Sequence, residues 1–140
     1  MSFSKGEDQM SKVTDVVVSA FSECFLFVLL FTVSLTRFIL FLQACFNLGY
    51  AHFSLTHFAD AVRYYEQDLG LARDRKDRLA LARAYCNLGL AHKALGRLSE
   101  ALDCQQKCLR LMEALRNVNG KFRALGNIGD LMVKVGMLSL

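Results

Sequence analysis

A pattern that recurs along the chain is most complete in residues 84–111, which read AYCNLGLAHKALGRLSEALDCQQKCLRL. Shifted by 40 residues toward the N-terminus, the stretch aligns with residues 44–71, which carry the same Asn-Leu-Gly triplet and matching alanines and leucines. Shifted the other way, it meets Asn127, Ile128 and Gly129, a near copy of the triplet. Self-similarity at a fixed period of this size is the signature of a repeat architecture.

Each repeat contains two segments with helical periodicity. In the second repeat, apolar and small side chains recur every three or four residues over 81–95, which predicts a helix with one buried stripe. Gly96 interrupts the pattern, as a residue that ends a helix often does, and a second stripe runs over 98–112. Gly89 and Ala101 are the small residues of the two stripes. We therefore expect the paired helices to approach each other closely there.

These patterns resemble the tetratricopeptide repeat family. The resemblance is carried by Asn47, Leu48, Gly49, Ala61 and Tyr65 in the first repeat, and by Tyr85, Asn87, Leu88, Gly89, Gly96 and Ala101 in the second. The usual unit has about 34 residues and a closing proline, whereas here the period is 40 and there is no proline. That departure resembles the subgroup with longer second helices and a recurring Asn-Leu-Gly triplet, which includes mitotic adaptors that orient spindles. The resemblance implies an all-α fold of helix-turn-helix repeats, stacked as a short right-handed solenoid.

The register of the repeats divides the chain into five parts. We predict a disordered tail over 1–15, a hydrophobic helix over 16–42, a first repeat over 43–77, a second over 78–117 and an incomplete third over 118–140. The third repeat stops where its second helix would begin. Terminal repeats normally carry a polar outer face, so we expect missing repeats or a partner chain to cover the C-terminal helix.

The hydrophobic segment has three interpretations. Residues 24–42 contain one charged side chain, Arg37, and a helix of that length would span about 28 Å, close to the thickness of a bilayer core. The segment is a membrane anchor, a buried helix packed on the first repeat, or a splice-derived segment outside the family. The third interpretation rests on the repeat register, which is lost before Gln43.

Charge and cysteine content narrow the possible partners of the protein and its location. Residues 1–43 have a balance of −1 and residues 44–140 a balance of +5, with the basic side chains spread along the predicted helices. No basic cluster interleaved with aromatic residues occurs, so we expect no nucleic-acid partner. The five cysteines have no regular spacing, which argues against a disulfide scaffold and favours a reducing, cytoplasmic location.

The sequence shows no motif for catalysis or for a cofactor. It lacks a glycine-rich phosphate loop, a nucleophile motif and a standard metal-ligand spacing. Cys104 and Cys108 lie four residues apart, and His92 could approach them from the paired helix, but their spacing matches no strong zinc signature. We expect core side chains at these positions, and neither an enzyme nor a metal protein.

A set of polar residues beside the apolar stripes indicates a binding surface. Arg83, Asn87 and Leu90 are spaced i, i+4 and i+7 on the first helix of the second repeat. By the resemblance, first helices line the concave surface, so stacking would align such residues into a groove. The predicted peptide-binding groove comprises Gln43, Asn47, Tyr50, Arg83, Asn87, Leu90, Lys93, Arg123, Asn127, Asp130 and Lys134.

Two roles are open for the groove asparagines. An amide can pair with an extended peptide backbone, and Arg83 and Arg123 could hold a carboxylate in bidentate fashion. The amides could instead bond between neighbouring repeats and fix their stacking. Gln43 replaces the arginine in the first repeat and Asp130 replaces Leu90 in the third, which argues against a uniform clamp for acidic peptides.

We therefore expect a non-catalytic scaffold or adaptor that binds a peptide or protein partner in the groove. By resemblance, it would act in mitosis and cytokinesis, near the spindle midzone or midbody. The alternatives are a membrane-anchored adaptor, held through residues 24–42, and a truncated, non-functional isoform of a longer array.

Overall fold

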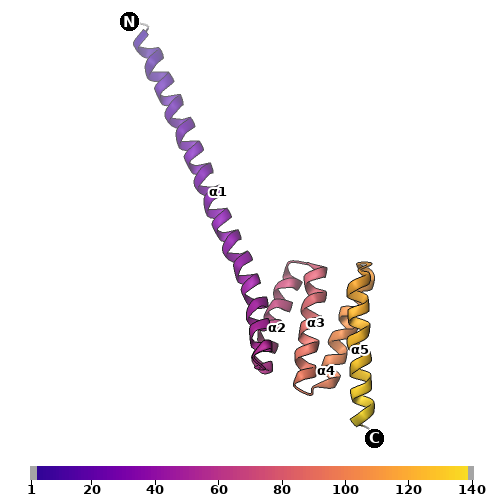
Figure 1. Cartoon of the computed structure of the whole chain (residues 1–140). Helices are drawn as coiled ribbons and strands as arrows, with labels where there is room; N and C mark the ends of the chain where they lie inside the picture. Colours follow the sequence, from indigo (N-terminus) through magenta and orange to yellow (C-terminus); the bar gives the residue numbers. More distant parts are fainter. Residues whose placement is uncertain (1–2, 139–140) are drawn as a thin grey trace. The chain divides into compact units, whose positions relative to one another are not determined.

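The computed structural model describes residues 3–138, which are helical apart from short turns (Figure 1). The helices are α1 (Phe3–Ser54), α2 (Phe58–Asp74), α3 (Arg78–Ala94), α4 (Leu98–Ala114) and α5 (Val118–Leu138). From α2 onward, consecutive helices pack against each other as in a tetratricopeptide-like solenoid, which confirms the predicted all-α fold. Residues 1–2 of the predicted tail and 139–140 of the predicted third repeat lie outside the described residues.

The chain divides into an N-terminal unit, Met1–Phe41, and a repeat unit, Leu42–Leu140. The sequence predicted a disordered tail over 1–15, but α1 begins at Phe3. An ion pair one turn apart, from Lys12 Nζ to Asp8 Oδ2 at 2.8 Å, lies on this polar part of the helix. Adding a turn to an existing helix costs much less than starting one, so a polar segment can continue the apolar helix that follows it.

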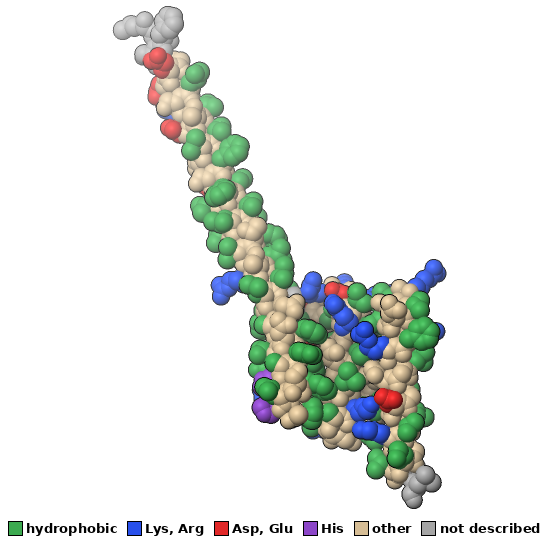
Figure 2. Space-filling view, viewed as in Figure 1, with side chains coloured by type: hydrophobic (Ala, Val, Ile, Leu, Met, Phe, Trp, Pro, Cys, Tyr) green, Lys and Arg blue, Asp and Glu red, His purple; other side chains and the backbone are tan. Residues whose placement is uncertain are grey.

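The N-terminal unit carries the apolar segment. Large side chains such as Phe25, Leu30 and Phe31 are exposed, and hydrophobic side chains cover this part of α1 in Figure 2. Of the described helices, the one over Lys5–Ser54 is long and apolar enough to cross a membrane. Length and composition alone give this indication, and signal sequences share them.

The four turns between helices have one backbone conformation. Thr56, Lys76, Gly96 and Arg116 all have positive φ, between 53° and 75°. The N–H of the following residue donates to a carbonyl five residues earlier, as from His57 to His52 at 2.8 Å, which is the Schellman ending of a helix. Since the turn is the same each time, helices begin regularly at residues 58, 78, 98 and 118.

Within residues 3–138, side-chain caps occur only at alternate turns. Asp77 Oδ1 accepts a hydrogen bond from the Ala80 N–H at 2.9 Å, and Asn117 Oδ1 accepts one from the Gly120 N–H at 2.8 Å. His57 and Arg97 precede α2 and α4 without a side-chain cap. The side-chain caps thus start α3 and α5, the helices that the sequence assigns to the groove.

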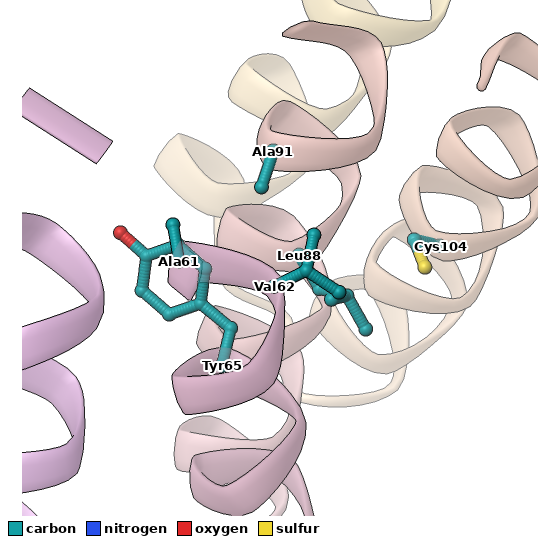
Figure 3. Close-up of a cluster of buried hydrophobic side chains, with 6 residues drawn as sticks. All are labelled: Ala61, Val62, Tyr65, Leu88, Ala91 and Cys104. Carbon is teal, nitrogen blue, oxygen red and sulfur yellow. The ribbon is translucent and has the colours of Figure 1, made fainter. Parts of the chain in front are cut away.

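The core consists of two clusters that link neighbouring helices. Figure 3 shows the first cluster, formed by Ala61, Val62 and Tyr65 of α2, Leu88 and Ala91 of α3, and Cys104 of α4. The second cluster joins Ala82 and Cys86 of α3, Cys108 and Met112 of α4, and Ala124 of α5. Each helix therefore packs on the next, as expected for a stack of repeats.

The triplet glycines differ in their surroundings. A Cβ at Gly89 would lie 2.6 Å from the Gln105 side-chain nitrogen and 3.2 Å from the Ala101 carbonyl oxygen, which confirms the close approach of α3 and α4. At Gly49 a Cβ would meet the Tyr65 ring at 2.6 Å. Gly129 on α5 faces nothing within 4 Å. The expectation that another segment or chain covers α5 stays a prediction.

Candidate peptide-binding groove

The predicted groove residues lie on α1, α3 and α5. In the repeat unit, α3 and α5 contact each other directly, and basic side chains gather on the face that these helices present in Figure 2. The exposed members of the set are Gln43, Asn47, Tyr50, Arg83, Arg123, Asp130 and Lys134, and the partly buried members are Asn87, Leu90, Lys93 and Asn127. All but the three on α1 therefore lie on two neighbouring helices.

One ion pair joins the second and third repeats within this set. Lys93 Nζ lies 3.2 Å from Asp130 Oδ2, and the lysine side chain is 21% exposed against 69% for the aspartate. Among the described residues, Arg83, Arg123 and Lys134 have no salt bridge. Asp130, the acidic residue of the predicted groove, is therefore paired, and three cations of the groove have no acidic partner in the part of the chain that the structure describes.

Asn127 connects three helices. Its Nδ2 donates to Gln105 Oε1 of α4 at 3.2 Å and to Cys86 Sγ of α3 at 3.6 Å. Gln105 is 1% exposed, and its own amide donates to the Cys86 carbonyl at 2.9 Å. In the third repeat, the asparagine therefore has the repeat-stacking role, and Gln105 completes it. A glutamine on the apolar stripe of the second repeat was the sequence signal for this bridge.

The other two asparagines have different neighbours. Asn47 Oδ1 accepts a hydrogen bond from the Gln43 amide, one turn earlier on the same helix, at 3.0 Å. Asn87 is partly buried and has no side-chain hydrogen bond to another described residue. Its amide can therefore donate and accept toward a bound chain without breaking an existing bond.

Titratable groups beside the face are perturbed. Burial raises the pKa of Asp68 on α2, and the charge of Arg83 partly offsets this effect. A hydrogen bond with Cys108 lowers the pKa of the Cys86 thiol against the effect of burial, and Arg123, Gln105 and Asn127 lower it further. The same hydrogen bond raises the pKa of the Cys108 thiol. Arg123 therefore favours negative charge at the seam between repeats.

A second groove lies between α2, α3 and α4, on the side of the second helices. Its lining includes Arg73, Tyr85, His92, Cys104 and Lys107. Cys108 is instead part of the other core cluster, so the two cysteines that we considered as zinc ligands with His92 lie in different surroundings.

A further cluster, at the turn between α1 and α2, was not predicted from the sequence. His52, His57 and Asp60 flank the turn between α1 and α2, and their potential ligand atoms lie within 4.8 Å of one another. Two histidines on either side of a predicted turn, with an aspartate three residues on, were the available signal.

Helix pairs joined by identical turns, with a polar face on alternate helices, define a helical-repeat protein. The tetratricopeptide repeat model matches residues 42–114, more than half of the chain, so the chain belongs to the tetratricopeptide repeat family. It is also similar to G-protein-signaling modulator 1 of Homo sapiens, with 44% identity over 61 residues. This alignment covers 44% of the chain but only 9% of the length of that relative. Such repeats are typical of non-enzymatic proteins that bind other proteins.

Proposed function

We propose that the chain is a non-catalytic scaffold that binds an extended acidic segment of a partner protein across α3 and α5. The observation that carries the proposal is the set of basic side chains, Arg83, Arg123 and Lys134, on the same two helices as the free amide of Asn87. Guanidinium groups bind carboxylates in bidentate geometry. The balance of +5 over residues 44–140 would add long-range attraction for an acidic partner.

The negative charge of Asp130 argues against an acidic ligand, and the ion pair with Lys93 removes this argument. Asp130 would repel an acidic ligand if it were free, but Lys93 lies 3.2 Å away and offsets its charge. Gln43 still replaces an arginine on α1, so we expect the acidic side chains of the partner to contact α3 and α5, and its backbone to extend toward α1.

Fluorescence anisotropy with a labelled glutamate-rich peptide tests this function. The double variant Arg83→Ala, Asn87→Ala should bind at least about tenfold more weakly, because a hydrogen bond to a charged group contributes roughly 1.5–3 kcal/mol. Arg110→Ala on α4 is the matched control and should bind like the natural chain. Unchanged binding in the double variant refutes the groove. A loss of helicity by circular dichroism shows that these residues have a structural role instead.

The cellular role is part of the proposal. Residues 83–117 resemble tetratricopeptide repeat protein 28, which supports a role in mitosis and cytokinesis, in the cytoplasm and at the spindle midzone or midbody. The name of the curated relative suggests G-protein signalling as another setting. Imaging of the fluorescently tagged full chain through cell division tests the mitotic role. Enrichment at the midzone that the double variant loses supports this role, and a uniform distribution contradicts it.

A membrane-anchored adaptor is the second proposed function. It is favoured by the length and apolar character of α1 between Lys5 and Ser54. If the anchor exists, the full chain stays in the membrane pellet after carbonate extraction, and the double variant Leu29→Asp, Leu30→Asp is released. Thr32→Ser is the matched control and stays in the pellet. Release of the natural chain contradicts the anchor.

A further inference from the structure

Three metal-ligating side chains converge where α1 turns into α2. His52 is in the last turn of α1, His57 is the residue before α2, and Asp60 is in the first turn of α2. One potential ligand atom from each lies within 4.8 Å of the other two. We propose that these three residues form a binding site for one divalent transition-metal ion, with zinc as the best match.

The donor set suits zinc. Histidine nitrogen and carboxylate oxygen are both common zinc ligands, and ligand atoms on one tetrahedral ion lie about 3.4 Å apart at bond lengths of ~2.1 Å. The three side chains would therefore have to close by an ångström or so. His57 is exposed and Asp60 is partly exposed, so both can rotate toward the ion. Three protein ligands leave a fourth position for water or for a partner's carboxylate.

The backbone between the two histidines is fixed. The His57 N–H donates to the His52 carbonyl at 2.8 Å, and the Ala61 N–H donates to the His57 carbonyl at 3.0 Å. These bonds close the turn and begin α2, so the histidine backbones keep their separation when the side chains move. A site that is built before the ion arrives loses less conformational freedom on binding.

The ring of His52 is also held in place. It stacks on Tyr64 with ring centres 5.2 Å apart and an interplanar angle of 13°, and the His57 ring lies 5.8 Å away. Within the described residues, His52 Nδ1 is buried and has no hydrogen-bond partner. The stacking on Tyr64 restricts rotation of the His52 ring, so less conformational freedom is lost when this ring binds an ion.

The second repeat provides an internal comparison. Residues His92, Arg97 and Glu100 occupy the places of the three proposed ligands, 40 residues later. His92 Nδ1 is likewise buried without a partner, so this atom does not distinguish the repeats. The difference is at Arg97, a cation that supplies no ligand and repels a metal ion. The site is therefore a property of the first repeat.

An existing contact competes with the ion only weakly. Asp60 Oδ1 lies 3.6 Å from Arg63 Nη1, and the arginine side chain is 77% exposed. Exposed pairs at this spacing are weak, so Asp60 can leave Arg63 for a metal. A bound ion would link the end of α1 to the start of α2, where no side-chain cap is present.

Zinc chloride titrated into the purified full chain, followed by calorimetry, tests the site. We expect one ion per chain and a rise of several degrees in the melting temperature. The single variants His57→Ala and Asp60→Asn should each weaken binding roughly tenfold or more. Arg97→Ala, at the equivalent place in the second repeat, is the matched control and should leave both affinity and stoichiometry unchanged.

Cobalt(II) as a spectroscopic probe separates this site from the five cysteines. Absorption of a nitrogen- and oxygen-ligated ion that disappears in His57→Ala supports the proposal. Thiolate charge-transfer bands, or zinc affinity that is the same in His57→Ala as in the natural chain, overturn it. His57 is exposed and its side chain does not cap α2, so the variant keeps the fold, and circular dichroism verifies this.

Discussion

Thr56, Lys76 and Arg116 adopt the left-handed backbone conformation that Gly96 adopts at the equivalent turn. This conformation costs a residue with a side chain roughly 1–2 kcal/mol, and most for a β-branched residue, whereas glycine takes it freely. The backbone is therefore strained at these three residues, although the turns share one conformation.

At Thr56, replacement by glycine should stabilise the fold. We expect Thr56→Gly to raise the free energy of unfolding by about 1 kcal/mol, because relief of the strain exceeds the extra backbone entropy of the unfolded chain. Urea unfolding followed by circular dichroism measures this. Gly96→Ala is the reciprocal variant and should lower stability by a similar amount. A neutral or destabilising Thr56→Gly would contradict this account of the turns.

The close approach of α3 and α4 predicts opposite effects at two triplet glycines. Gly89→Ala should cost about 1–3 kcal/mol, since its Cβ would press on the buried Gln105 amide and on the Ala101 carbonyl. Gly129→Ala has open space around it and should stabilise the fold by up to about 1 kcal/mol through helix propensity. The same urea measurement compares the two, and equal effects would show that the helices do not pack as described.

The buried thiol of Cys104 predicts a loss of stability in alkaline solution. Burial raises the pKa of this thiol from 9.0 to about 11. Above pH 9 the unfolded chain loses the proton before the folded chain does, so this contribution to stability is complete below pH 9 and disappears as the pH rises through 11. The loss approaches about 3 kcal/mol at high pH, since each tenfold difference in acidity between the folded and unfolded thiol is worth about 1.4 kcal/mol.

Cys104→Ala provides the comparison for this pH dependence. The variant lacks the titrating group, so its free energy of unfolding should fall less steeply between pH 9 and pH 11, while tyrosine and lysine titrations remain common to both chains. Parallel curves for the two chains would show that Cys104 does not titrate differently on unfolding.

At the scale of the helices, the asparagine of the third repeat fastens α5 to its neighbours. Asn127→Ala should lower the free energy of unfolding by about 1–3 kcal/mol, because the buried Gln105 oxygen loses its donor. Asn87→Ala removes no internal hydrogen bond and should change stability by less than about 0.5 kcal/mol. Hydrogen exchange on α5 should accelerate only in Asn127→Ala. Equal destabilisation of both variants would contradict separate roles for these two residues.

The sequence predicted the helices well because their periodicity and turns are local. The recurring triplet and Gly96 indicate where the turns lie. A connection of only three residues makes the next helix run back along the previous one. The start of α1 was predicted wrongly because no proline separates the polar tail from the apolar segment, so one helix continues through both.

The side-chain partners could not be predicted in the same way. Asn47, Asn87 and Asn127 share one register position, yet their contacts depend on residues far away in the sequence. Asn127 meets Gln105, and the place equivalent to Gln105 in the preceding repeat is Tyr65, which has no amide to offer Asn87. Contacts between repeats therefore vary, although the backbone repeats.

At the scale of the whole molecule, the cations on α3 and α5 differ in their surroundings from those on α2 and α4. Lys107 on α4 forms an ion pair with Asp103, and Arg73 of α2 lines the same groove as Glu100 and Asp103. Among the described residues, Arg83, Arg123 and Lys134 on α3 and α5 form no salt bridge. An acidic ligand should therefore distinguish the two pairs of helices, although basic residues occur on both.

Photo-crosslinking of the full chain to a glutamate-rich peptide with a benzophenone side chain, followed by mass spectrometry, shows whether an acidic peptide binds across α3 and α5. We predict adducts within α3 and α5, around Arg83 and Arg123, and their loss in Arg83→Ala, Asn87→Ala. Adducts around Arg73 and Lys107 on α2 and α4 would contradict this prediction, as would adducts that the double variant retains.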